Sequence, residues 1–343
     1  MQSRFVYVRA VIFVGLAIIA GTLLASRASE AIDLFRFQLC WAGVLVALHG
    51  LARRRPGGSP LATSADWAAC ALASVLFWDL FELVDLRLRN WWYTGVSPNP
   101  LVSAAFGAVA FATVLPAVRL GISLRGPQAA VLSRRRPALL FAIGLLMLAL
   151  ALAFPRQAFP LAWLFLWPLC EAACCLLPPR TLLTPLESRV FLRTALFGLP
   201  LGLVWESLNW QCARGWIYTV PHFERWKLFE MPLAGYLGYL PFLLEAAAAL
   251  ALLDRLRPHL RGARGAAATV AVLALHFGAD QLARRQTVLS FAPYDASGVA
   301  PEVLRLEQKT HMGLWRAQAV VDRGFSALAD DPALVRLWMA KAR

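Results

Sequence analysis

Long apolar segments separated by short polar stretches run along the first 283 residues of the chain. Most of them approach the ~20 apolar residues that an α-helix needs to cross a bilayer. This pattern is typical of a polytopic membrane protein rather than a soluble domain. The predicted spans are 6–25, 34–52, 66–86, 100–121, 137–155, 158–178, 189–208 and 228–253, with a ninth apolar segment at 266–283 whose crossing the sequence leaves open.

Composition and charge fit this class. Hydrophobic residues make up 59% of the chain and charged residues only 16%, whereas soluble domains are roughly half apolar and a quarter charged. The net charge of +14 comes almost wholly from Arg, and the Arg residues gather in loops after even-numbered spans. The positive-inside rule then places these loops and the N-terminus in the cytoplasm. We therefore predict a multi-pass protein of the bacterial inner membrane that binds no nucleic acid.

Two similar motifs stand in the two halves of the chain. "WDLFELVDLRLRNWWYT" starts at Trp78, and "WESLNWQCARGWIYT" starts at Trp205. Both have Trp, an acid, Trp, Tyr and Thr in the same order, followed by a proline 23 residues after the tyrosine. Asp79 aligns with Glu206 when a two-residue gap is allowed. The ordered match favours an internal duplication.

The predicted fold is an all-α membrane bundle of eight to nine transmembrane helices. It is built from two parallel four-helix repeats, at 1–128 and 129–283, of which the second also carries the ninth segment. An even number of spans keeps both repeats in the same orientation, so a site is expected between them. The remaining residues, 284–343, form a small polar helical tail.

The tail contains "MGLWRAQAVVDRGFSALADDPALVRLW", which resembles a degenerate helix-hairpin-helix unit. Gly313 and Gly324 would allow its turns, and Asp331 with Pro332 would begin a helix. Because the tail is only mildly basic, a protein partner is favoured over nucleic acid.

Acids inside membrane spans are costly, at ~2.5–3.5 kcal/mol each, and are therefore candidates for function. Glu206 and Glu230 fall near the outer ends of their spans, and Asp79 and Glu82 fall at a similar level in the first half. Glu245 lies much deeper, where it is either paired with Arg or a backbone donor, or functional. Solvation at the span ends, an interfacial aromatic belt and a helix start at "FEMP" provide the purely structural interpretation.

If the acids form a site, a neutral carboxyl group beside an ionised one suits acid/base chemistry. The candidate catalytic residues are Glu206, Glu230, Asn209 and Glu245. The candidate substrate-binding residues are Trp216, Tyr218, Asp79, Glu82, Trp91, Tyr93 and Tyr236. His276 and Asp280 share a helix face, but two ligands without a third make a weak metal site. No metal and no cofactor are expected.

The layout of the second motif, "WESLNWQCARGWIYTVPHFERWKLFEMP", resembles heterodimeric-type lycopene cyclase domains, and the first motif resembles a second copy. These membrane modules carry an acid after Trp, a Trp-x-Tyr hinge, and a proline with acids that opens the next span. In this chain the acid Glu230 precedes Pro232 instead of following it. The resemblance implies a related fold and an enzyme that acts on an isoprenoid. In that case Glu206 and Glu230 would be the acid/base residues, and Trp216 and Tyr218 would form the wall that faces the developing cation.

Three functions follow as alternatives. An enzyme acting on a membrane lipid or another hydrophobic small molecule predicts a closed pocket near which Glu206 and Glu230 converge. A secondary transporter predicts a polar pathway from the outer acids to Glu245 and Glu171, with broken spans. A non-catalytic scaffold predicts that the tail is the contact with a protein partner. No nucleotide-binding loop or nucleophile motif is visible.

Overall fold

The computed structural model describes residues 2–289 except 56, 95, 98, 125–135, 179–183, 188–190, 211, 213, 219 and 223–225. Nearly all of the predicted tail, including its helix-hairpin-helix resemblance, lies outside the described residues.

The described chain is mostly helical, and each predicted span corresponds to one helix or to two consecutive helical segments. The long helices are α1 (Gln2–Ala25), α3 (Arg36–Ala52), α4 (Ser64–Leu88), α5 (Pro100–Phe111), α6 (Val114–Ser123), α7 (Pro137–Ala153), α8 (Leu166–Leu176), α9 (Phe191–Asn209), α10 (Tyr239–Leu256) and α11 (Ala263–Gln286). The short helical segments are α2 (Glu30–Leu34), η1 (Phe159–Trp163), η2 (Pro185–Glu187), η3 (Leu233–Gly238) and η4 (Arg257–His259).

Seven helical segments of the described chain are long and apolar enough to cross a membrane, and α11 is one of them. The segment at 266–283, which the sequence left open, therefore satisfies the same criterion as the other spans. Helices α3 and α7 are apolar but shorter. These segments are compatible with an integral membrane protein.

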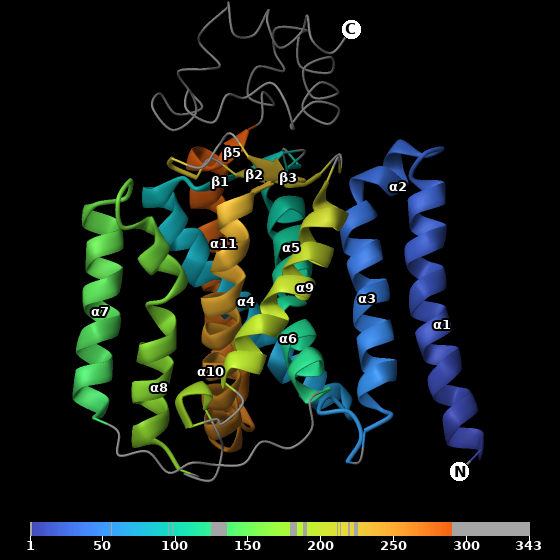
Figure 1. Cartoon of the computed structure of the whole chain (residues 1–343), viewed down its shortest axis with the longest axis horizontal. Helices are drawn as coiled ribbons and strands as arrows, with labels where there is room; N and C mark the ends of the chain where they lie inside the picture. The colour runs from blue at the N-terminus through green and yellow to red at the C-terminus, as the bar shows by residue number, and fades with distance from the viewer. Residues whose placement is uncertain are drawn as a thin grey trace, which may run out of the picture.

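The helices form a broad bundle with a pair of helices at each edge (Figure 1). Helices α1 and α3 pack together at one edge, and α7 and α8 pack together at the other. The remaining long helices lie between these pairs. The N-terminus lies at one end of the bundle, and the short strands lie at the opposite end.

The predicted span 100–121 is broken into α5 and α6, and a side chain of α4 forms hydrogen bonds with the backbone at the break. Backbone N–H and C=O groups that lose their helical hydrogen bonds inside a membrane need other hydrogen-bond partners. Ser74 of α4 supplies them, because its hydroxyl donates to the carbonyl oxygen of Phe111 and accepts from the backbone N–H of Leu115 at 2.9 Å. The side chain of one helix thus stabilises the bend in another.

The two Trp-x-Tyr motifs form strands. Strand β1 (Trp91–Thr94) lies between β2 (Trp216–Tyr218), to which it is antiparallel, and β5 (Val288–Leu289), to which it is parallel. Strands β3 (Lys227–Leu228) and β4 (Met231–Pro232) form a separate hairpin. The predicted helix start at "FEMP" is therefore wrong. Phe229 and Glu230 form the turn of this hairpin, with Phe229 at a φ of 58°, and the next helical segment begins only at Leu233.

Candidate functional site

The strand pair β1–β2 brings the two sequence motifs side by side. In its antiparallel register, Trp91 is opposite Tyr218 and Tyr93 is opposite Trp216. Residues that are more than 120 positions apart in the sequence therefore share one small sheet. Each strand places its tyrosine over the helix that precedes it in the chain.

The second motif builds a hydrogen-bonded group around Glu206 of α9, which is fully buried. Its Oε1 atom accepts hydrogen bonds from the hydroxyl groups of Tyr218, at 2.8 Å, and Tyr239, at 2.5 Å. The Trp216 Nε1–H in turn donates to the Tyr218 hydroxyl oxygen at 2.9 Å. Oε2 of Glu206 is buried and has no hydrogen-bond partner among the described residues.

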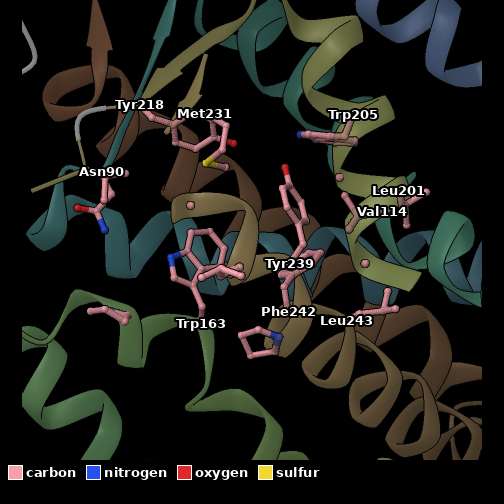
Figure 2. A pocket seen from close by; sticks show the side chains of 18 of the residues that line it. Asn90, Val114, Trp163, Leu201, Trp205, Tyr218, Met231, Tyr239, Phe242 and Leu243 are labelled. Carbon is pink, nitrogen blue, oxygen red and sulfur yellow. The ribbon is translucent and has the colours of Figure 1, made fainter. Parts of the chain in front are cut away.

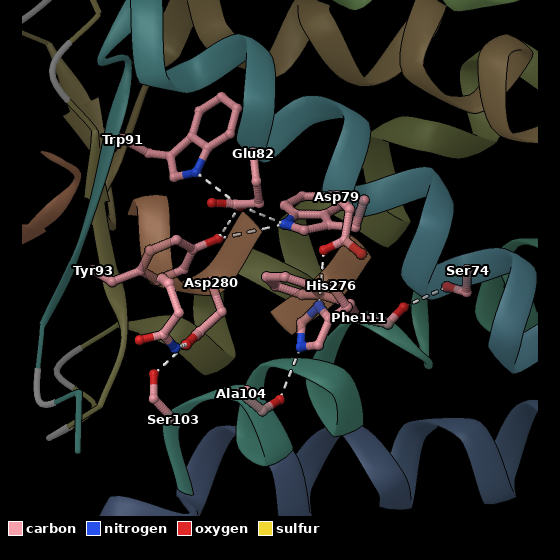
Figure 3. A network of polar contacts seen from close by, with 12 residues as sticks. Ser74, Asp79, Glu82, Trp91, Tyr93, Ser103, Ala104, Phe111, His276 and Asp280 are labelled. Atoms are coloured by element: carbon pink, nitrogen blue, oxygen red, sulfur yellow. Dashed lines mark hydrogen bonds and ion pairs between the residues drawn. The ribbon is translucent and has the colours of Figure 1, made fainter. Parts of the chain in front are cut away.

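The first motif builds a similar group around Glu82 of α4 (Figure 3). Oε1 of Glu82 accepts from Tyr93 at 2.5 Å, from the Trp78 indole at 2.8 Å and from the Trp91 indole at 3.2 Å. Its Oε2 is also buried without a hydrogen-bond partner in the described part of the chain. Both motifs thus bind a buried carboxyl group through a tyrosine hydroxyl.

A polar residue one helical turn after each glutamate holds the following strand. Asn209 accepts from the backbone N–H of Trp216 at 3.0 Å and donates to its carbonyl oxygen at 2.8 Å. Asp85 accepts from the backbone N–H of Asn90 at 2.7 Å. By these contacts the counterpart of Glu206 is Glu82, whereas the sequence alignment had matched it with Asp79.

Asp79 belongs to a different contact. Its Oδ1 atom lies 2.8 Å from Nδ1 of His276 in α11, and Nε2 of that ring lies 2.8 Å from the carbonyl oxygen of Ala104 in α5 (Figure 3). Because a carbonyl oxygen only accepts, the His276 Nε2–H is the donor to Ala104, and Nδ1 is the ring nitrogen that contacts Asp79. The residue predicted to bind substrate therefore ties three helices together.

A large apolar cavity lies between the helices and beside the Glu206 group (Figure 2). Its volume is about 350 Å³, which is within the usual range for small-molecule sites. Much of its wall is aromatic, and the hydroxyl-bearing side chains of Tyr218 and Tyr239 also line it. Its aromatic walls come from Trp41, Trp78, Phe159, Trp163, Trp205, Tyr218, Tyr239 and Phe242.

A second cavity of about 110 Å³ lies on the other side of an aromatic partition. Its lining includes Glu82 and Tyr93 of the first group, together with Arg214, Asp280 and Arg284. The two cavities share the side chains of Trp78, Trp163, Trp205 and Tyr218 as common walls. Trp216 and Tyr218 of the Glu206 group also line the second cavity, so the two groups meet at this aromatic partition.

Tyr239 is a site residue that the sequence did not indicate. The sequence pointed to Tyr236, but the hydroxyl of Tyr236 donates to the carbonyl oxygen of Leu228 at 3.1 Å and does not line the large cavity. Tyr239 lies at the junction of η3 and α10, where its hydroxyl reaches Glu206. Two tyrosines three positions apart look alike in a sequence, and only the path of η3 distinguishes them.

Glu230 lies close to the Glu206 group as predicted, but on a different element. It is 2% exposed in the β3–β4 turn, near enough for its charge to act on Glu206. Met231, the next residue, lines the large cavity. The hairpin therefore covers the site at the end of the bundle where the strands lie.

The two deeper acids contact backbone amides. Oε1 of Glu245 accepts from the N–H of Leu166, the first residue of α8, at 2.8 Å. Oε1 of Glu171 accepts from the N–H of Leu186 at 2.8 Å and from the Trp167 indole at 3.2 Å. Of the alternatives for Glu245, the structure shows the backbone donor, and neither acid lines either cavity.

The tyrosines of the two strands keep their protons. Burial, together with the neighbouring carboxyl group of Glu206, raises the pKa of Tyr218 well above its usual value. Burial and Glu82 do the same to the pKa of Tyr93. Both hydroxyl groups are thus hydrogen-bond donors to their glutamates at neutral pH, which fixes the direction of each bond.

His276 and Asp280 each form a hydrogen bond with a different residue. His276 contacts Asp79, and Asp280 accepts from the hydroxyl of Ser103 at 2.9 Å. Within the described residues, no group of three or more His, Cys, Asp or Glu side chains could hold a metal ion.

No protein-family model, no curated protein and no solved structure matches the chain. The resemblance to lycopene cyclase domains therefore stays a prediction from the sequence motifs.

Proposed function

We propose that the protein is a membrane-embedded enzyme that transfers protons on an isoprenoid or another hydrophobic lipid. One observation carries this proposal. Tyr239 lines an apolar cavity of about 350 Å³ and donates a hydrogen bond from its hydroxyl group to the buried carboxyl group of Glu206. A proton-transfer group at the wall of a lipid-sized, aromatic cavity suits chemistry on a carbon–carbon double bond.

The chemistry is a proton transfer in two directions. In the forward step, Glu206 is protonated and gives its proton to the Tyr239 oxygen, while the Tyr239 hydroxyl turns toward the cavity and gives its own proton to a substrate carbon. Faces of the cavity aromatics, such as Trp163, Trp205 and Phe242, then stabilise the carbocation. In the second step, a neighbouring carbon loses a proton to the Tyr239 oxygen, and Glu206 is protonated again. The net result is an isomerised or cyclised lipid with no net change in protons.

A transporter is supported less well. That alternative needs a polar pathway from the outer acids to Glu171 and Glu245. Both of these carboxyl groups bind backbone amides instead, and the large cavity is lined mainly by apolar side chains. The break between α5 and α6 is the feature that a transporter would share, but Ser74 satisfies its freed backbone groups.

The internal duplication and the membrane orientation belong to the same proposal. The equivalent contacts of Glu82 with Tyr93 and Glu206 with Tyr218 support a duplication, as do the paired helices at the two edges. Helices α3 and α10 end, near their Arg residues, at the same end of the bundle as the N-terminus (Figure 1). This arrangement supports a cytoplasmic N-terminus in the bacterial inner membrane.

The test compares lipid extracts, by mass spectrometry, from a strain that lacks the gene and from the same strain carrying variants. Tyr239→Phe and Glu206→Gln are expected to lower product formation by about 10²–10⁴-fold, as for loss of a general acid or base. The matched control is Tyr236→Phe, which removes a hydroxyl outside the cavity and should behave as wild type. An unchanged lipid profile in both the deletion strain and the Tyr239→Phe strain would contradict the enzyme proposal.

A further inference from the structure

The large cavity has a mouth on the outer surface of the bundle. Most residues that line it are buried or half-buried, and the exposed ones are Pro160, Ala234 and Leu237. Pro160 belongs to η1, and the other two belong to η3. The cavity therefore opens between these two segments.

The mouth lies at membrane depth. Segment η1 begins one candidate span, Phe159–Leu176, and η3 begins another, Leu233–His259. Leu233 and Leu237 are 51% and 64% exposed on η3, as expected for side chains that face lipid tails. Irregular helical turns at this depth are tolerated where they line a cavity. The opening is therefore a lateral one, toward the bilayer.

The second cavity differs in chemistry because hydrogen-bonding groups line it. Glu82 and Asp280 supply acidic groups, and Arg214 and Arg284 supply cationic groups. Two carboxyl groups thus stand beside two guanidinium groups, and Asp280 acts electrostatically on both cations. Glu82 is 3% exposed, and its Oε2 has no hydrogen-bond partner among the described residues. This small space therefore offers an acceptor and donors, with as many carboxyl groups as guanidinium groups.

We infer that the two cavities form one bent site for a single-chain lipid with an uncharged polar end, such as an isoprenoid alcohol. The chain enters laterally between η1 and η3 and fills the apolar cavity. Its hydroxyl group passes the aromatic partition and donates to Oε2 of Glu82. A balanced pair of cations and acids suits a hydroxyl group better than a phosphate, whose charge would need a surplus of cations. This inference deepens the proposed function and rests on it for the catalytic role of the site, but not for binding.

The experiment measures binding to the full chain in lipid nanodiscs. The probe is a C20 isoprenoid alcohol with a photoreactive diazirine beside the hydroxyl, and the competitors are the same alcohol, its monophosphate and the matching hydrocarbon, all without the diazirine. We expect saturable cross-linking to residues that line the second cavity, with competition by the alcohol and about tenfold weaker competition by the other two ligands.

Two variants test the mouth and the inner end of the site. Ala234→Trp fills the mouth, and its control is Leu233→Trp, an exposed neighbour that does not line the cavity. Ala110→Leu fills the second cavity, and its control is Ala105→Leu, an exposed residue on the same helix that does not line it. Both filling variants should lose cross-linking, and both controls should retain it. Ala234→Leu, a smaller change, keeps the test valid if the Trp variant does not fold, and should show a partial loss.

Equal competition by the hydrocarbon or the phosphate, or retained cross-linking in Ala110→Leu, would overturn the inference. Measuring both cross-linking and the lipid profile for the Glu206→Gln variant tests this inference separately from the proposed function. If the alcohol binds but the Glu206→Gln strain has a wild-type lipid profile, the site stands and the enzymatic role fails. If the lipid profile changes but the alcohol does not bind, the enzyme stands and the bent site fails.

Discussion

The role of each buried acid in this protein depends on which groups donate hydrogen bonds to it. Glu206 and Glu245 are both buried acids in apolar helices. Glu206 faces two tyrosine hydroxyls, a type of group that can both donate and accept a proton. Glu245 faces the N–H groups at the start of a neighbouring helix, which only donate. The same side chain is therefore a proton-transfer candidate in one place and a helix cap in the other.

Replacing Glu245 tests the capping role. Glu245→Ala leaves the first amide of α8 without its side-chain acceptor, and an unsatisfied buried group costs about 1–3 kcal/mol. Glu245→Gln keeps an acceptor oxygen and should lose much less. Thermal unfolding in detergent measures the loss of stability in both variants. A Glu245→Ala variant as stable as wild type would contradict the cap.

Cys212 predicts a pH dependence. Burial raises the pKa of its thiol to about 11, although the Arg36 guanidinium group, whose Nε lies 3.3 Å from the sulfur, opposes the shift. Because the thiolate is the reactive form, alkylation of the folded protein should be slow at neutral pH and should still increase at about pH 10. In the denatured protein the rate should level off soon above the usual thiol pKa of about 8.5. Peptide-mapped labelling with iodoacetamide measures both curves, and matching curves would show that the shift is absent.

At the scale of the elements, close contact between α9 and the start of α10 positions the candidate proton donor. A side chain at Gly198 or Gly202 would collide with Tyr239. Small residues allow helices to approach closely in membranes. The glycines of α9 therefore allow Tyr239 of α10 to approach α9 closely enough for its hydroxyl group to reach Glu206, which is also on α9.

Gly202→Ala tests this contact. The added Cβ would lie 2.5 Å from Cγ of Tyr239, so the ring must shift away from position 202, which disturbs the position of its hydroxyl group beside Glu206. Overpacking of this kind costs about 1–3 kcal/mol, and lipid conversion should fall with it. The control is Gly278→Ala on α11, where an added Cβ meets nothing within 4 Å. Comparing lipid profiles and unfolding temperatures of the two variants gives the result, and equal behaviour would refute the positioning role.

At the scale of the whole molecule, the site lies toward the end where the strands gather, opposite the N-terminus (Figure 1). The sheet and the β3–β4 hairpin cover the two glutamate groups at this end. If the N-terminus is cytoplasmic, the glutamate groups lie toward the outer leaflet. The substrate would then come from that leaflet.

Cysteine labelling tests this orientation. Trp226→Cys, beside the hairpin, should react with a membrane-impermeant maleimide from the outer side of intact cells. His259→Cys, at the end of η4, should react only in inverted vesicles. Both parent residues are exposed, and the native cysteines are buried or half-buried, so the wild type serves as the control. The opposite pattern would invert the proposed topology.

The sequence by itself indicated the membrane class and the positions of the long helices, and it singled out the two motifs. Apolar length and Arg-rich loops are local properties of the chain, so they can be read without knowledge of its folding. Glu82, Glu206, Tyr93 and Tyr218 were named for the same reason. An acid in a span is costly wherever it lies, and a motif is visible when it occurs twice.

Only the tertiary structure decided the partners of these residues. The pairing of β1 with β2, the contact of Asp79 with His276 and the choice of Tyr239 over Tyr236 join segments that are distant in the chain or differ by one turn. Such contacts depend on how helices pack and where they bend, and hydrophobic patterning does not encode either. The acids were therefore predictable, but whether each one caps a helix, ties helices together or faces a cavity was not.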